Sequence, residues 1–229
     1  MEVQGISELV GQLDAVLTIE RAEMSLTNCT VENLLFRRPR LLNILHSVKL
    51  ANATSQTIPA ELEVLERYAT GAQCALEIGT YQGVSAGRIA NALATGGLLY
   101  CVDPWPRPDG GENPCWSICR RHLRRSGVEN RIRFLRGYSR DLAKTIPDGL
   151  DFAFVDGDHS WGGIDTDWRI VADKVISNGV ICLHDALVPP GQEWRRLESC
   201  RYFESVIVPD PRFSVLETIH SLAVLQKDK

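Results

Sequence analysis

The sequence has 229 residues, of which 44% are hydrophobic, and these values suit one sizeable globular domain with a small appendage. The formal net charge is -4, so the composition gives no general case for binding nucleic acid. No apolar run is long enough to span a membrane, and the first residues lack the segments of a secretory signal. Seven cysteines without a repeating pattern favour reduced thiols, so we expect a cytoplasmic protein.

The first 55 residues are predicted to be helical. Apolar residues recur at helical spacing over 5–20 and again over 31–49, where Pro39 interrupts the pattern. We expect residues 1–55 to form an extension that packs over the remaining domain, residues 56–229, or over a second copy of the chain. A dimer formed through these helices is the expected assembly. A further helix is expected to begin at Pro59, with Glu61 in its first turn.

From residue 74 onwards, predicted strands and helices alternate. The strands are expected over 74–79, 98–103, 132–136, 150–156 and 179–184, and the helices over 84–95, 113–126, 139–146 and 162–176. The tail suggests a helix over 191–200, followed by an antiparallel hairpin of strands 203–208 and 213–219. This alternation predicts an α/β fold with a Rossmann-like, doubly wound and mostly parallel sheet.

The turn after the first predicted strand indicates a ligand that is not a dinucleotide. Gly79 and Gly83 follow the acid Glu77, but Tyr81 stands where a dinucleotide-binding turn would have its middle glycine. Asp103 ends the second strand, where a carboxylate accepts hydrogen bonds from both hydroxyls of an adenosine ribose. Taken alone, Asp103 could equally cap the following loop. The order of these residues along the chain favours the ribose.

Acids and histidines follow two later strands. The segment Asp156-Gly-Asp-His159 comes after the fourth strand, and His184-Asp185 ends the fifth. Ligands of open α/β sheets bind at the carboxyl ends of the strands, so these side chains predict an active site, although Asp156 alone could cap a helix. His159 is the preferred general base because histidine exchanges a proton near neutral pH. His184 is the alternative, and it could equally be structural.

Together the segments 77–85, 100–103, 155–159 and 179–185 resemble the class I S-adenosylmethionine-dependent methyltransferases. The similarity is greatest to the small-molecule O-methyltransferases of the macrocin and catechol type, and it covers about residues 56–208. It implies a seven-stranded sheet with an antiparallel edge strand and S-adenosylmethionine as cofactor. The implied acceptor is a hydroxyl of a small molecule, such as a sugar or phenolic natural product.

The resemblance also implies roles for individual residues. The implied cofactor contacts are Glu77, Gly79, Tyr81, Gly83, Ser85, Asp103, Ser139 and Asp156, with Ser139 near the adenine or simply capping a helix. His159 matches a catalytic lysine of the catechol members. Asp156 and Asp185 match the ligands of the metal-dependent members and make Mg²⁺ a candidate. Ala186 departs from that pattern, because an Asn or Asp usually stands there.

The segment 107–144 is basic, with ten Lys or Arg against four Asp or Glu. A solvated helix face explains it best, and an anionic acceptor or an acidic partner is the alternative. The loop 104–118 is a candidate substrate lid with Trp105 and Trp116, and Trp161 either lines the acceptor pocket or packs. The rival function is a non-catalytic methyltransferase-like subunit that binds a partner through residues 1–55. A nicotinamide-dependent oxidoreductase is disfavoured by the missing glycine.

Overall fold

A computed structural model describes residues 38–106, 112–189, 191–192 and 196–229. Cα packing divides the chain into two units, Met1–Leu42 and Asn43–Lys229. The helix predicted over 5–20, and the first part of the one predicted over 31–49, lie outside the described residues. Helix α3 (Pro39–Ser47) begins at Pro39 instead of being interrupted there, since proline fits the first helical position. The predicted domain boundary at residue 55 stays a prediction.

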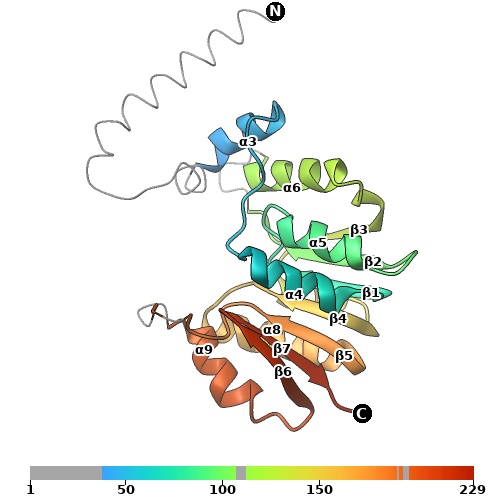
Figure 1. The fold of residues 1–229 in the computed structure, drawn as a ribbon, viewed down its shortest axis with the longest axis vertical. Helices are drawn as coiled ribbons and strands as arrows, with labels where there is room; N and C mark the ends of the chain where they lie inside the picture. The colour runs from blue at the N-terminus through green and yellow to red at the C-terminus, as the bar shows by residue number, and fades with distance from the viewer. Residues whose placement is uncertain (1–37, 107–111, 190, 193–195) are drawn as a thin grey trace, which may run out of the picture. The chain divides into compact units, whose positions relative to one another are not determined.

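Seven strands form one sheet in the order β3-β2-β1-β4-β5-β7-β6 (Figure 1). They are β1 (Cys74–Ile78), β2 (Leu98–Asp103), β3 (Ile132–Arg136), β4 (Leu150–Val155), β5 (Val175–Leu183), β6 (Phe213–Ile219) and β7 (Leu222–Lys227). Strands β1 to β5 are parallel to one another, and β7 is antiparallel to both β5 and β6. The predicted fold class is therefore confirmed, with the antiparallel pairing at one edge.

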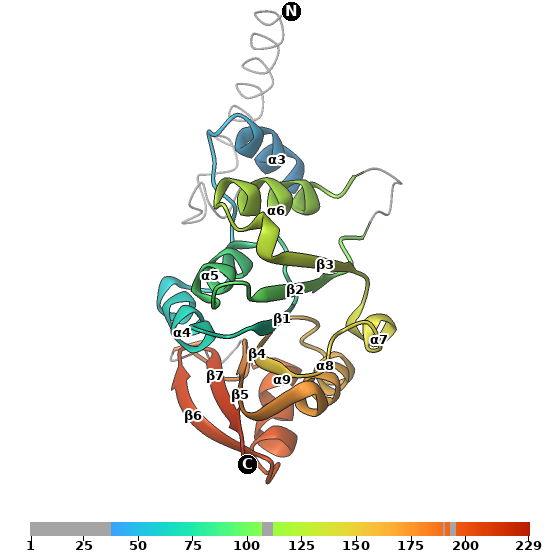
Figure 2. The ribbon, with the colours of Figure 1, turned by 90° about the vertical axis from the view of Figure 1, so that its right-hand side faces the viewer.

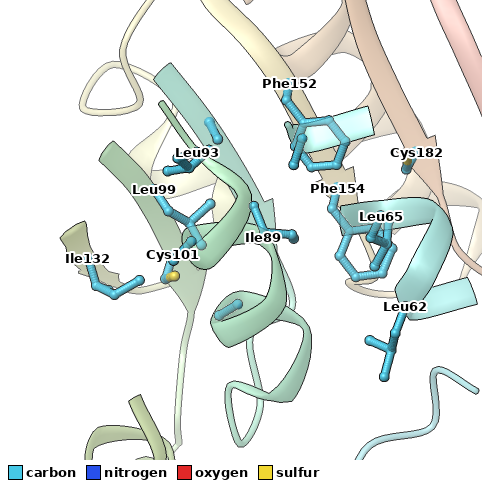
Figure 3. Close-up of a cluster of buried hydrophobic side chains, with 14 of the residues drawn as sticks. Leu62, Leu65, Ile89, Leu93, Leu99, Cys101, Ile132, Phe152, Phe154 and Cys182 are labelled. Carbon is cyan, nitrogen blue, oxygen red and sulfur yellow. The ribbon is translucent and has the colours of Figure 1, made fainter. Parts of the chain in front are cut away.

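Helices cover both faces of this sheet (Figure 2). On one face lie α4 (Pro59–Ala69), α5 (Val84–Ala92) and α6 (Pro114–Arg125), and on the other α7 (Ser139–Leu142), α8 (Trp161–Lys174) and α9 (Glu198–Tyr202). Figure 3 shows the first of the two resulting cores, where Leu65 of α4 and Ile89 of α5 lie near Phe154 of β4. Trp168 and Val171 of α8 belong to the second core. Burial on both faces explains the nearly continuous apolar runs of the central strands.

The tail departs from the prediction. Residues 203–208, predicted as a strand, continue α9 as a π-helical turn, η3 (Phe203–Ile207). Tyr202, Phe203 and Ile207 are buried while Ser205 is exposed. A strand would place residues 203, 205 and 207 on one face and residue 202 on the other, so this burial pattern belongs to a helix. The described part of the helix predicted over 191–200 begins only at Glu198.

The hairpin of the tail consists of β6 and β7, and the sequence reading missed β7. Its first four residues are fully buried, so it has no alternation of polar and apolar residues to mark it as a strand. The other predicted strands and helices of the domain are present, with shifted ends. Among them, β5 is longer than predicted and α7 is shorter.

Strand register aligns the carboxyl ends of four parallel strands. Ile78 of β1 pairs with Val102 of β2 and Val155 of β4, and Val155 pairs with Leu183 of β5. The residues that directly follow these positions are Gly79, Asp103, Asp156 and His184. The sheet therefore brings the predicted site residues together along the edge formed by the carboxyl ends of the parallel strands. Open α/β sheets bind their ligands at this carboxyl-terminal edge.

Gly79 allows the chain to turn tightly at this edge. Its φ angle is +92°, and a Cβ atom there would lie 1.8 Å from the carbonyl oxygen of Asp156. The backbone of Asp156 is itself held against β1, because its N–H donates to the carbonyl of Ile78 at 2.8 Å. The missing side chain of Gly79 thus lets the chain after β4 come close to the turn after β1.

Gly79→Ala is expected to destabilise the fold by about 3 kcal/mol or more, since it adds a backbone overlap to the strain of a positive φ. Gly71→Ala is the matched control. Gly71 has a φ of +83° with nothing within 4 Å of the added Cβ, and its replacement should cost only about 1–2 kcal/mol. Urea denaturation of both variants measures the difference, and equal losses would contradict the proposed overlap.

Candidate active site

Asp103 is fixed at the end of β2 by the backbone of two neighbouring turns. Its carboxylate accepts hydrogen bonds from the N–H of Tyr81 at 2.8 Å and of Trp105 at 2.7 Å. Trp105 in turn donates its indole N–H to the carbonyl of Tyr81 at 2.8 Å. Burial raises the pKa of Asp103, against the effect of these backbone hydrogen bonds. Each carboxylate oxygen still has a lone pair that can accept from a ligand hydroxyl.

Glu77 lies beneath the first turn, inside the protein. It is fully buried and accepts a hydrogen bond from the hydroxyl of Ser85 at 2.6 Å. Burial raises the pKa of Glu77 to about 7, although the hydrogen bond from Ser85 works in the opposite direction. The hydroxyl proton of Ser85 is therefore used by Glu77, so Ser85 can donate to a ligand through its backbone N–H at the start of α5.

Two aspartates and two histidines form one cluster at the ends of β4 and β5, and we call it the Asp–His cluster: Asp156, His159, His184 and Asp185. His159 Nε2 lies 3.7 Å from Asp156 Oδ1 and 3.7 Å from Asp185 Oδ2. His184 Nδ1 lies 3.0 Å from the same oxygen of Asp156 and 3.8 Å from the same oxygen of Asp185. Both carboxylates thus face both imidazole rings.

The two histidines differ in exposure. The His159 side chain is 29% exposed, and that of His184 is 3% exposed. The second ring nitrogen of His184, Nε2, lies 3.3 Å from the carboxylate of Glu61 in α4. Burial works against a charged ring, but the hydrogen bonds with Asp156 and Glu61 outweigh it and raise the pKa of His184 to about 10. Carboxylates at both ring nitrogens thus favour the protonated form of His184.

Helix α9 fastens the two loops that carry the Asp–His cluster. The backbone N–H of Ser199 donates to the carbonyl of His159 at 3.1 Å, and its hydroxyl donates to the carbonyl of Asp185 at 2.7 Å. The thiol of Cys200 also contacts the carbonyl of Asp185, at 3.3 Å. Asp185 has a φ of +50°, a conformation that non-glycine residues rarely adopt, and these contacts stabilise it.

Ser139 starts helix α7 and donates its hydroxyl to Asp167 of α8. Asp167 is buried, and burial raises the pKa of its carboxyl to about 6. The Ser139 hydroxyl thus joins α7 to α8 in this structure. It does not cap its own helix, since no side-chain cap is formed at the start of α7.

The residues at the Asp–His cluster do not fit a divalent cation. Among the described residues, no group of three or more His, Cys, Asp or Glu side chains is arranged to hold a metal ion. The inward oxygens of Asp156 and Asp185 already face the ring nitrogens of His159 and His184 at 3.0 to 3.8 Å. Ala186, where a third oxygen ligand was sought, is buried and has none to offer.

Comparison with known proteins agrees with this geometry. Residues 76–186 match the family model described as a methyltransferase domain. We call the matched segment, residues 76–186, the methyltransferase domain after this similarity. This match includes every predicted site residue, from Glu77 to Asp185, and the predicted resemblance to class I methyltransferases is confirmed. A comparison with curated proteins found no match.

Solved structures share the fold of this methyltransferase domain. An O-methyltransferase from Bacillus cereus, solved in complex with SAH, aligns with a TM-score of 0.61 at 18% identity over 93% of this chain and 97% of that one. The O-methyltransferase TomG from Streptomyces achromogenes, solved with SAM, gives 0.62 at 15% identity over 93% and 96%. A methyltransferase from Geobacter sulfurreducens gives 0.59 at 16% identity over 97% and 96%.

Two tryptophans of the methyltransferase domain were assigned wrongly to a lid. Trp105 and Trp116 are buried, and their rings lie 4.6 Å apart with Phe134 against both. Residues 107–111 of the predicted lid lie outside the described residues, and α6 begins at Pro114. Trp161, by contrast, is 42% exposed beside the Asp–His cluster and packs edge-on against Tyr202.

The basic helix α6 of the methyltransferase domain is largely occupied by structural contacts. Arg125 donates to the carbonyls of His46 and Ser47 at the end of α3, and Arg121 donates to Asn43. Burial and these guanidinium groups lower the pKa of His46 to about 4, so it stays neutral. Arg124 pairs with Glu129 at 2.9 Å. Arg121, Arg124 and Arg125 thus have structural partners within the protein, where the sequence suggested a solvated helix face or, as the alternative, a site for an anionic acceptor.

Sequence reasoning missed Glu61, Ser199 and Asp167 of this site. Glu61 was interpreted only as an acid in the first turn of a helix, and its carboxylate does accept the Ile58 N–H at 3.0 Å. Nothing in the spacing of Glu61 and His184, 123 residues apart, predicts their contact.

No helix in the described part of the chain is long and apolar enough to cross a membrane.

Glu77→Gln is expected to remove a pH dependence of stability. The carboxyl of Glu77 has a pKa of about 7 when folded and about 4.5 when unfolded, so its contribution is complete below about pH 4.5 and is lost as pH rises to 7. The free energy of unfolding falls by about 3 kcal/mol over this range, since each unit of pKa difference corresponds to about 1.36 kcal/mol. The variant should therefore gain stability relative to the parent between pH 4.5 and 7.5, as measured by urea denaturation.

Glu63→Gln is the control for this experiment, because it removes an acid from an exposed position of α4. If the unfolding free energies of Glu77→Gln and of the parent changed with pH in the same way across this range, the raised pKa of Glu77 would be contradicted.

Proposed function

We propose that this chain transfers the methyl group of S-adenosylmethionine to a hydroxyl oxygen of a small molecule, such as a sugar or a phenol. One observation carries the proposal: a fixed carboxylate, Asp103, and a partly exposed histidine, His159, stand at the same edge of one sheet. They supply the two functions that the reaction needs, which are donor binding and removal of the acceptor proton.

Three parts of the chain would hold the methyl donor, whose sulfonium supplies an electrophilic methyl group. The carboxylate of Asp103 is oriented by two backbone N–H groups, and it would accept from the ribose hydroxyls. The turn from Gly79 to Gly83 and the start of α5 would face the methionine part, where the helix N-terminus favours a carboxylate. Structures of O-methyltransferases with this fold that contain SAH or SAM support this donor.

His159 is the proposed general base. Its ring is accessible, and it lies between two carboxylates that would stabilise the proton it takes from the acceptor hydroxyl. His184 suits this role poorly because both of its nitrogens face carboxylates inside the protein. Asp156 and Asp185 would then orient His159 and balance its charge. The proposal contains no Mg²⁺, because the donor set does not fit that ion.

The alternative is a non-catalytic methyltransferase-like subunit. The Asp–His cluster argues against this alternative. Burying several charged groups where ligands bind costs free energy of folding, and a chain without an activity would have no reason to retain them. Residues 1–37, most of the segment that would bind a partner or form a dimer, lie outside the described residues. A dimer and a cytoplasmic location accordingly stay predictions.

Asp103→Asn should weaken binding of S-adenosylhomocysteine roughly 10- to 100-fold, since it removes a charged acceptor from two hydroxyls. Asp151→Asn is the matched control, because Asp151 also accepts two backbone N–H groups, from Gln73 and Cys74, at the opposite end of β1. Calorimetry should find unchanged affinity in the control. The donor assignment fails if the parent protein binds neither S-adenosylmethionine nor S-adenosylhomocysteine at millimolar concentration.

His159→Gln should lower kcat roughly 10²- to 10⁴-fold while leaving the affinity for S-adenosylhomocysteine unchanged, because it removes the base and not a donor contact. His122→Gln, a change in α6, is the control. Product formation is followed by mass spectrometry with a hydroxyl acceptor identified in a screen of phenols and sugars. Undiminished turnover of His159→Gln would rule out this residue as the base.

A further inference from the structure

Glu61 reaches the Asp–His cluster from outside the matched domain. It belongs to α4, fifteen residues before the matched segment begins at residue 76, and it is fully buried. A buried carboxylate must be paired with hydrogen-bond donors to remain charged. Its partners therefore indicate what it does.

The carboxylate of Glu61 is held by donors from three parts of the chain. Oε1 accepts from the N–H of Ser221 at 3.0 Å and from its hydroxyl at 2.7 Å. Oε2 accepts from the N–H of Ile58 at 3.0 Å and faces His184 Nε2 at 3.3 Å. His220 Nδ1 lies 3.4 Å from Oε1. Three uncharged donors thus fix the carboxylate in place, and the ring of His184 completes its surroundings.

Both ring nitrogens of His184 face carboxylates. Nε2 faces Glu61, and Nδ1 faces Asp156 at 3.0 Å and Asp185 at 3.8 Å. An ionised carboxylate only accepts hydrogen bonds, so a ring held in this way has a proton on each nitrogen. The ring of Phe154 lies edge-on to it at 6.3 Å and closes its apolar side.

We propose that Glu61 is a positioning residue that holds His184 as an imidazolium between Asp156 and Asp185, in the place where the family resemblance made Mg²⁺ a candidate. The positive ring balances the two aspartates, which would otherwise repel each other at the site. It also leaves His159 as the accessible histidine of the cluster. Only this last consequence rests on the proposed function.

The charged surroundings of His184 come from four elements of the fold. They are Glu61 of α4, Asp156 and His159 after β4, Asp185 after β5, and His220 of the β6–β7 turn, which acts through Glu61. Three carboxylates thus act on one ring. Removing the charge of Glu61 leaves the aspartates in place, so its effect on the ring can be measured separately.

The test is NMR of the histidine rings in the full-length chain labelled with ¹⁵N-histidine, with His184 assigned by the loss of its signals in His184→Gln. In the parent protein both ring nitrogens of His184 should be protonated from pH 6 to 9. In Glu61→Gln the midpoint for losing one proton should fall by about 1 to 3 pH units. Glu63→Gln, on the exposed face of the same helix, should behave as the parent.

Three outcomes would overturn the proposal. The first is a singly protonated His184 in the parent protein at pH 7, a measurement that does not depend on whether Glu61→Gln folds. The second is calorimetric binding of Mg²⁺ to the parent at submillimolar concentration that disappears in Asp185→Asn. The third is a folded Glu61→Gln with unchanged ring signals of His184, as expected if Glu61 were purely structural. No methyl donor is added, so this proposal and the proposed function can fail separately.

Discussion

The candidate site depends on the register in which four parallel strands end. Ile78, Val102, Val155 and Leu183 lie at one level of the sheet, so whatever follows them meets at one edge. The contact between Gly79 and the backbone of Asp156 brings the turn after β1 against the chain after β4. A shift of one strand by one residue would turn its side chains to the opposite face and separate the acids from the histidines. The chemistry of the edge is therefore a consequence of backbone pairing.

The second requirement is that buried charges balance. Glu61, Asp156 and Asp185 surround His184 at a place where water is largely excluded, and a carboxylate without a partner there would be strongly destabilising. Hydrogen bonds lower the pKa of Glu61 to about 2, although burial opposes its charge, and they raise the pKa of His184 to about 10. The two groups stabilise each other's charged form. Within the cluster, His159 is the histidine that keeps access to solvent.

The parts predicted well are those that local patterns decide. The alternation of apolar runs with helical spacing gave the sheet and the helices, and Asp103, Asp156 and Asp185 were placed at strand ends because each follows an apolar run. The errors have local causes too. In the tail, Phe203 and Ile207 were interpreted as part of a strand although they lie four residues apart on one helical face. Strand β7 shows no alternation because it is buried on both faces between β5 and β6.

The sequence by itself determined the fold class, the methyltransferase resemblance and the edge of the sheet where acids and histidines gather. These follow from spacings of a few residues, which the periodicity of strands and helices sets. Only the tertiary structure decided which histidine is buried, that Ser85 faces Glu77, and that α9 fastens the loops of His159 and Asp185. It alone brought Glu61 to His184 across 123 residues, because packing between distant elements, which no local pattern records, decides which charges share a buried space.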